Sequence, residues 1–374
     1  MILRIFDNLE KEFRNNRVLI IYGARRTGKT TLLKKYLEGC SKKYLFETGE
    51  NLRFSEIMRS MDVQKMKEMA SEYEIVAIDE AQLIPDIGQS LKILIDHVPS
   101  THFIATGSSS FDLNQKVGEP LTGRKRTILL FPLSQKELKN HFTSYELKEN
   151  FEDFLIFGSY PEVVCAKTKA EKIEILQELA NSYLLKDILA FDRVKSSKTL
   201  LNLLRLLAFQ VGNQVSLNEL ATQLGIDIKT VDRYLDLLEK TFVIRKISAF
   251  SRNLRKEIVS KAKYFFLDNG VRNSLITRFN PILERDDMGA LFENFMISER
   301  IKKLSYENFY GNLYFWRTYG GQEIDLIEEV DGLINGFEFK WGQKTPSAPP
   351  DWKKAYRKAG FNVINRENYL KFVL

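Results

Sequence analysis

The segment GARRTGKTT, residues 23–31, constrains this chain more than any other feature. A glycine, four residues and then Gly28-Lys29-Thr30 have the spacing of a phosphate-binding P-loop. Glycines allow successive backbone N–H groups to point at a phosphate that a Cβ would obstruct. Residues 18–22 before it are continuously apolar, and TLLKKYL after it has helical spacing. The pattern therefore predicts a buried parallel strand, a nucleotide-binding loop and a helix whose N-terminus faces the phosphates.

The loop predicts a nucleotide with Mg²⁺ as its ligands. Lys29 would place a positive charge near the β- and γ-phosphates, and Thr30 would offer a hydroxyl to Mg²⁺. A glycine-rich turn without a ligand is the alternative interpretation. The other candidate contacts to the nucleotide are Gly23, Arg26, Thr27, Gly28 and Thr31.

Two more segments predict groups near the γ-phosphate. Residues 74–80, EIVAIDE, form an apolar strand that ends in two carboxylates. Asp79 would hold Mg²⁺, directly or through water, and Glu80 would orient the attacking water, although such a pair can also be an ordinary strand cap. Residues 102–110, HFIATGSSS, end in hydroxyls that could contact the γ-phosphate or the water; the alternative is a polar turn.

Length and composition limit the other possibilities. The 374 residues predict two or three domains, and 44% hydrophobic residues are enough for packed cores. We expect a cytoplasmic protein with no membrane partner, because no apolar run reaches roughly 18 residues and the N-terminus lacks the apolar segment of a signal peptide. Two cysteines and three histidines argue against a disulfide framework and against a thiolate or histidine metal site. The net charge of +7 mildly favours a polyanionic partner such as nucleic acid.

Several ordered motifs resemble those of the AAA-type ATP-binding proteins of bacteria and archaea. They are GARRTGKTTLL, IVAIDEAQ, FIATGSSS, LTGRKRTILLFPLSQKEL and FGSYPEVV. The resemblance implies an α/β P-loop ATPase core with a parallel sheet at residues 1–132, a helical lid at 133–195 and ATP as the nucleotide. It also implies that Ser108 is in the sensor position and that Arg124 is a candidate arginine finger. Such an arginine can act in cis or from a neighbouring subunit, and in the second case the active form is a homo-oligomer. The alternative is a solvated basic turn.

Residues 196–256 predict a winged helix–turn–helix. The segment SLNELATQLGIDIKTVDRYLDLLEKTFVIRKI contains two amphipathic helices around Gly225 and the start of a wing at 242–244. The outward face of the second helix mixes acids and bases, which suits protein docking as well as duplex binding. The wing offers candidates for phosphate contacts rather than base reading: Arg245, Lys246, Arg252, Arg255 and Lys256.

Residues 257–374 resemble the PD-(D/E)XK nuclease-like fold, an α/β domain. Glu293 falls in a predicted helix, Asp325 in a strand, and Glu338 and Lys340 on one side of the next strand. In active members of that fold two carboxylates hold a divalent metal and the lysine helps to activate water. The resemblance makes Glu293, Asp325 and Glu338 candidate metal ligands, and Glu338 and Lys340 candidate catalytic residues. A solvated set of ion pairs is the alternative, and the fold alone does not establish cleavage.

These interpretations combine into one functional hypothesis. We expect a protein that binds and hydrolyses ATP, and whose nucleotide state positions the winged helix and the nuclease-like domain on DNA. One alternative is an ATP-gated switch that binds nucleic acid or protein through an inactive nuclease-like domain. Another is a scaffold whose assembly depends on the nucleotide and involves no nucleic acid.

Overall fold

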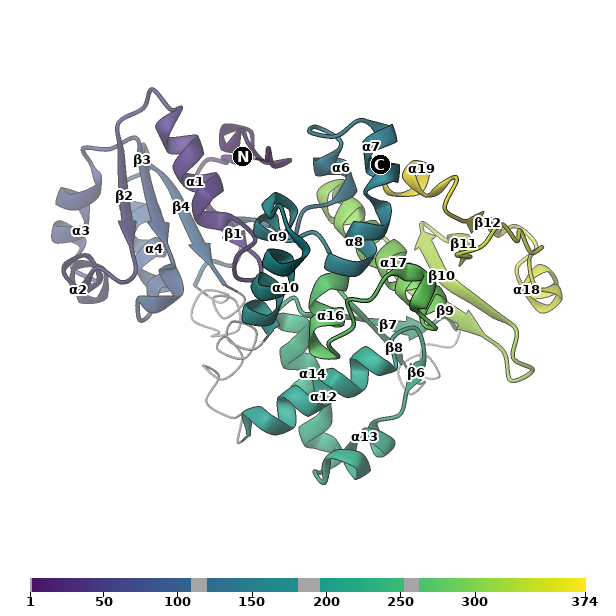
Figure 1. Ribbon diagram of the computed structural model, residues 1–374. Helices are drawn as coiled ribbons and strands as arrows, with labels where there is room; N and C mark the ends of the chain where they lie inside the picture. Colours follow the sequence, from purple (N-terminus) through teal and green to yellow (C-terminus); the bar gives the residue numbers. More distant parts are fainter. Residues whose placement is uncertain (1, 109–119, 181–195, 252–261) are drawn as a thin grey trace.

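The computed structural model describes residues 2–108, 120–180, 196–251 and 262–374 (Figure 1). Within these ranges the strands form two sheets, one of five strands and one of seven. The two sheets lie at opposite ends of the molecule, and a group of helices lies between them. Each candidate site is on one of these two sheets.

The N-terminal sheet is entirely parallel and has the order β2-β3-β4-β1-β5. Alternate residues of β1 pack on opposite faces: Leu19 and Ile21 against α1, and Val18 and Ile20 against the cluster that includes α4. Burial on both faces explains the continuous apolar run in the sequence. The elements are β1 (Val18–Tyr22), α1 (Lys29–Glu38), β2 (Tyr44–Thr48), α2 (Leu52–Ser60), α3 (Val63–Ala70), β3 (Ile75–Asp79), α4 (Ile87–His97), β4 (His102–Gly107) and β5 (Lys125–Leu129).

A helical segment follows the first sheet. Three of its helices begin with a capping box, in which a Ser or Thr hydroxyl and a Glu carboxylate each bind the other's backbone N–H. The helices share one hydrophobic core with α16 and α17 from the C-terminal part of the chain. The predicted lid therefore packs on the C-terminal domains. Its helices are α6 (Gln135–Leu138), α7 (Ser144–Glu149), α8 (Phe151–Phe157), α9 (Pro161–Cys165) and α10 (Lys169–Glu178).

The middle segment contains two helices joined by a tight turn. Gly225 ends the first helix with φ +64°, a left-handed conformation that favours glycine, and Asp227 caps the second. Strands β7 and β8 then pair antiparallel, which is the element order of a wing. The winged-helix assignment itself stays a prediction. The elements are α12 (Ser197–Phe209), β6 (Gln214–Val215), α13 (Leu217–Leu224), α14 (Ile228–Lys240), β7 (Ile244–Ala249) and β8 (Ala262–Phe266).

The wing strands belong to the seven-stranded sheet, whose order is β12-β11-β10-β9-β7-β8-β6. Asp331 and Gly332 both have positive φ between β10 and β11, which confirms the hairpin predicted from Asp-Gly. Because β7 pairs with β9, the middle and last segments form one continuous body. The remaining elements are α16 (Asn269–Leu275), α17 (Met288–Tyr306), β9 (Asn312–Arg317), β10 (Glu323–Val330), β11 (Leu333–Phe339), α18 (Pro350–Ala355), β12 (Gly360–Ile364) and α19 (Tyr369–Val373).

Candidate functional site

The loop between β1 and α1 requires both of its glycines. A Cβ on Gly23 would lie 2.1 Å from the carbonyl oxygen of Leu130, and Gly28 has φ +90° directly before α1 begins. The Lys29 ammonium is buried and donates to the carbonyl oxygens of Gly23 and Ala24, each at 2.9 Å. A phosphate entering the loop would compete with these two carbonyls for the lysine.

Thr30 and Asp79 come together as the sequence predicted. The Thr30 hydroxyl donates to Asp79 Oδ2 at 2.8 Å, and Asp79 is at the buried end of β3. The other carboxylate oxygen accepts a hydrogen bond from the Thr106 hydroxyl of β4. A hydroxyl and a carboxylate are hard oxygen ligands of the kind that Mg²⁺ prefers. The residues present therefore fit Mg²⁺, with Thr30 and Asp79 as its protein ligands.

Thr106 also positions the backbone of Glu80. The Glu80 N–H donates to the Thr106 hydroxyl at 3.2 Å, and the Glu80 carboxylate accepts from the Gln82 amide. Glu80 has φ +47°, a left-handed conformation that costs a non-glycine residue on the order of 1–3 kcal/mol and persists only where its surroundings hold it. Sequence reasoning missed Thr106, although this threonine is in the HFIATGSSS segment that was singled out for its serines.

Ser108 lies beside the P-loop. It is fully buried and follows Gly107, which is in register with Tyr22 at the end of β1. The carboxyl ends of parallel strands meet at one edge of a sheet, so Ser108 is at the edge that carries Gly23. The neighbouring hydroxyls, Ser109 and Ser110, lie outside the described residues. Thr31 is exposed on the first turn of α1.

The two candidate arginines have different settings. Arg26, with φ +58°, pairs with Glu162 of α9 at 3.1 Å and with Glu178 of α10 at 3.0 Å, so the P-loop contacts the helical segment. Arg124 pairs with Asp96 at the opposite edge of the sheet, where its carbonyl accepts from the N–H of Val18.

The position of Arg124 argues against a role in cis. Val18 begins β1 and the P-loop follows its end, so five strand residues, or roughly 16 Å, separate Arg124 from the phosphates of its own chain. The arginine cannot act in cis from there. A role in trans, toward the nucleotide of a neighbouring subunit, stays a proposal.

A buried arginine near the N-terminus links the P-loop to the C-terminal body. Arg4 donates to the Thr27 carbonyl at 3.1 Å and to the Phe131 carbonyl at 2.7 Å. Its Nε lies 2.8 Å from Glu137 Oε1, and its Nη2 lies 3.5 Å from the hydroxyl of Tyr306 in α17. The sequence gives no motif for Arg4, and only the fold shows this role.

The seven-stranded sheet brings the predicted carboxylates together. Burial, followed by repulsion from Glu293 and Glu338, raises the pKa of Asp325 well above its ordinary value. Burial also raises the pKa of Glu293, and repulsion from Glu323 and Glu338 acts in the same direction. The backbone N–H of Phe339 donates to Asp325 Oδ2 at 2.7 Å and holds this side chain in place.

Two lysines neutralise part of this cluster. The buried Lys263 of β8 lies 3.0 Å from Glu293 Oε1 and 2.5 Å from Glu323 Oε1. Lys340 Nζ lies 2.6 Å from Glu338 Oε1. Sequence reasoning missed Lys263 and Glu323; the available signal was a lysine in an otherwise apolar strand, because a buried lysine requires an acidic partner.

The cluster fits a narrower metal site than the sequence predicted. Among the described residues, no group of three or more His, Cys, Asp or Glu is arranged to hold a metal ion. Ammonium groups already bind two of the predicted ligands: Lys263 binds Glu293, and Lys340 binds one oxygen of Glu338. Asp325 and Glu338 remain, and Glu338 Oε2 is buried without a hydrogen-bond partner in the described part of the chain. Arg317 also pairs with Glu323, at 3.3 Å. When all four carboxylates are ionised, they therefore exceed the two lysines and this arginine by one negative charge.

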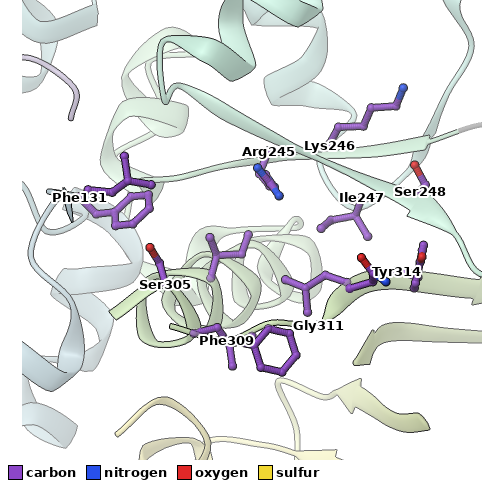
Figure 2. Close-up of a pocket in the computed structure, with 14 residues that line it drawn as sticks. Phe131, Arg245, Lys246, Ile247, Ser248, Ser305, Phe309, Gly311 and Tyr314 are labelled. Carbon is purple, nitrogen blue, oxygen red and sulfur yellow. The ribbon is translucent and has the colours of Figure 1, made fainter. Parts of the chain in front are cut away.

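The predicted phosphate contacts of the wing do not share one face. Arg245 and Lys246 line a cavity of about 460 Å³ between β7, β9, α17 and the segment that follows β5. Figure 2 shows Arg245 directed into this cavity and Lys246 directed away from it, as neighbours on a strand are. Glu239 lies 3.6 Å from the Arg245 guanidinium and accepts from the Lys246 N–H. Arg252, Arg255 and Lys256 lie outside the described residues.

Residues 15–139 match the family model described as an AAA domain. The match supports an AAA-type ATPase family. With its five-stranded parallel sheet, this AAA domain has the α/β architecture expected of a P-loop ATPase. Residues 148–281 and 288–369 match two further models, each described as a domain of unknown function (DUF8612 and DUF4143).

The relatives extend over most of the chain. An uncharacterized protein of Mycobacterium tuberculosis is 28% identical over 341 residues, which cover 90% of this chain and 73% of the relative. An uncharacterized protein of Haemophilus influenzae is 28% identical over 281 residues, or 69% of each chain. These names assign no activity.

Solved structures resemble the chain only distantly. The RuvB Holliday junction branch migration motor of Thermotoga maritima is 17% identical with a TM-score of 0.29, covering 64% of this chain and 84% of that one. A signal transduction ATPase with numerous domains from Pyrococcus horikoshii is 13% identical with a TM-score of 0.28, covering 77% of this chain and 44% of that one. TM-scores this low do not indicate a shared function. In the described residues no helix is long and apolar enough to cross a membrane.

Proposed function

We propose that the AAA domain hydrolyses ATP with Mg²⁺. The observation that carries the proposal is the hydrogen bond between Thr30 and Asp79, which joins the P-loop to the end of β3. In this proposal Lys29 moves from its two carbonyls to the β- and γ-phosphates, while Glu80 orients the attacking water. Mg²⁺, held by Thr30 and Asp79, would neutralise charge on the phosphates. The backbone N–H groups of the loop and Ser108 complete the site.

Phosphate release from ATP tests this proposal. We expect Mg²⁺-dependent hydrolysis that EDTA abolishes and that Lys29→Ala and Glu80→Gln each reduce by at least tenfold. Glu80→Gln should retain nucleotide binding, because the lysine and the loop are intact. Lys34→Ala is the matched control, since Lys34 is an exposed lysine on the same helix. If Lys29→Ala hydrolysed ATP as fast as Lys34→Ala, the hydrolytic site would not be the P-loop.

The second part of the proposal concerns the C-terminal domains. In this part the nucleotide state positions a winged helix and a nuclease-like domain on DNA. Asp325 and Glu338 would hold one divalent cation, and Lys340 would orient the water that attacks a phosphodiester. The observation that favours cleavage is an excess of negative charge beside Glu338 Oε2, which is buried and has no hydrogen-bond partner among the described residues. A switch that grips nucleic acid or protein without cutting it is the alternative.

Cleavage assays separate the two forms of this proposal. Linear, circular and single-stranded DNA would be incubated in Mg²⁺ or Mn²⁺ with and without ATP. Metal-dependent cutting that Glu338→Ala removes, and that Glu329→Ala retains, would support cleavage; Glu329 is an acid of the same hairpin outside the cluster. Sensitivity to Lys29→Ala would show control by ATP. Intact ATP hydrolysis without cutting of any DNA would favour the binding switch.

A further inference from the structure

A second cavity, of about 440 Å³, opens one residue beyond Lys340. Trp341 follows β11 and Arg366 follows β12, and both line it. The Lys340 N–H donates to the Ile364 carbonyl at 2.9 Å, so the two strand ends lie side by side. Residues that line the cavity therefore follow directly in sequence on residues of the acidic cluster, but none of the cluster's carboxylates lines the cavity.

Planar groups form a column in the wall of this cavity. The Arg366 guanidinium lies 4.3 Å from the ring centre of Trp341, and Trp341 is stacked against Phe151 at 6.1 Å and 22°. Phe151 is in turn stacked on Tyr369 at 4.3 Å and 27°. Arg366 forms the outer end of this column and is about half exposed, so a planar heteroaromatic ring can replace its guanidinium on Trp341 and gain the stacking energy of a nucleobase.

The polar rim of the cavity offers two basic side chains to a phosphate. Lys148 and Arg366 are exposed basic residues of the rim, and Glu367 is its acid. Arg366 lies 3.5 Å from Glu152, but both side chains are about half exposed, and such surface pairs contribute little. A phosphate can therefore displace Glu152 from the guanidinium without a large loss of stability.

We propose that this cavity binds an unpaired nucleobase of single-stranded nucleic acid, stacked on the outer face of Trp341 in place of the Arg366 guanidinium. The displaced Arg366 guanidinium then pairs with the adjoining phosphate, and Lys148 is the second base of the rim. The inference rests on the proposed action on nucleic acid and specifies its substrate class. Bases inside a duplex already stack on both faces, so this column is accessible to single strands, ends and loops.

Binding of labelled oligonucleotides to the full chain tests the inference, in EDTA and without ATP. We expect a twelve-residue oligo-dT or oligo-U to bind at least tenfold more tightly than a duplex of the same length. Trp341→Ala should weaken binding of the single strand about 5- to 150-fold, which is 1–3 kcal/mol for one stacked base. Trp341→Phe should retain most of it. Tyr319→Ala is the aromatic control, because Tyr319 is fully exposed in the turn after β9.

Tryptophan fluorescence gives a second measurement that does not depend on an alanine variant. Trp316 and Trp352 are buried, whereas Trp341 is partly exposed, so bound oligonucleotide should quench Trp341 alone. Loss of the quenching in a folded Trp341→Phe variant is the expected result.

Two results would overturn the inference. The first is equal affinity for single strand and duplex, and the second is unchanged single-strand binding by folded Trp341→Ala. In either case the wider proposal that the protein acts on nucleic acid would still stand. Failure to bind any nucleic acid would contradict both, and ATP hydrolysis would be unaffected.

Discussion

Replacing Arg4 with alanine should destabilise the protein by about 3 kcal/mol. The Arg4 guanidinium is buried and pairs with Glu137, whose side chain is also buried. Removing one partner of a buried ion pair costs about 3–5 kcal/mol, because the other charge is left without compensation. The lower end applies because other groups also donate to the Glu137 carboxylate: the N–H groups of Ile5 and Ser134 and the hydroxyls of Ser134 and Tyr306.

The measurement is a double-mutant cycle in urea unfolding. Arg4→Ala would be compared in the native chain and in Glu137→Gln, where no carboxylate charge is left behind. We expect the cost of Arg4→Ala to fall by about 1–3 kcal/mol in the second background. Arg26→Ala is the matched control, because its acidic partners are half exposed and its loss should cost about 1 kcal/mol or less.

The same variant should change nucleotide binding. Arg4 holds the carbonyl of Thr27 inside the P-loop, so its removal frees the loop backbone on the side away from the phosphates. We expect weaker ATP binding by Arg4→Ala even at temperatures where the variant is fully folded. A loss of stability below about 1 kcal/mol, or an equal loss in both backgrounds, would refute the argument that a buried charge pair joins the P-loop to the C-terminal body.

Three further predictions concern single side chains. Thr106→Val removes a hydrogen bond to the Asp79 carboxylate, and such a bond to a charged group contributes about 1.5–3 kcal/mol. Steady-state kinetics should therefore show kcat/KM for ATP reduced about 10- to 150-fold. An unchanged kcat/KM would show that this contact is not needed for hydrolysis. In EDTA, Asp325→Asn should stabilise the protein at pH 8 and lose that advantage toward pH 4. The raised pKa of Asp325 makes the native chain lose stability as pH rises above the ordinary value of 3.8, so a pH-independent difference would contradict the reasoning. Arg124→Ala should lower ATP hydrolysis only at protein concentrations where subunits associate, and an equal effect in dilute monomer would exclude a role in trans.

The P-loop and the end of β3 could be predicted because their chemistry depends on local sequence. Gly28 must adopt a positive φ immediately before a helix, and Asp79 must end a buried strand; both requirements leave a pattern within a few residues. The pairing of Thr30 with Asp79 then follows from parallel strands whose carboxyl ends meet at one edge. The hairpin at Asp331-Gly332 was predictable for the same local reason.

The parts that could not be predicted depend on contacts between distant segments. Arg4 and Glu137 are 133 positions apart in the sequence, and neither lies in a motif from which an ion-pair partner could be predicted. Lys263 reaches Glu293 and Glu323 only because the wing strands join the C-terminal sheet. The predicted domain boundary at residue 256 separates β8 from β7, whereas the two strands are neighbours in one sheet. A prediction with that boundary gives no reason to expect Lys263 near Glu293. The sequence left Arg124 open to a role in cis or in trans, because a basic turn has the same pattern at either edge of a sheet.

Helix α17 gives the proposed coupling between the two sites a physical route. Near its C-terminal end Tyr306 contacts Arg4, which holds the P-loop, and thirteen residues earlier Glu293 belongs to the acidic cluster. At 1.5 Å per residue these positions are roughly 20 Å apart on one rigid element. In the proposed function ATP would draw Lys29 away from the Gly23 and Ala24 carbonyls, close to the Thr27 carbonyl that Arg4 binds. A shift of Arg4 would move Tyr306, and with it the helix that positions Glu293 against Lys263. Coupling by this route requires the Arg4 contacts. In Arg4→Ala, ATP binding should therefore no longer change the acidic cluster, although the cluster itself should still be assembled.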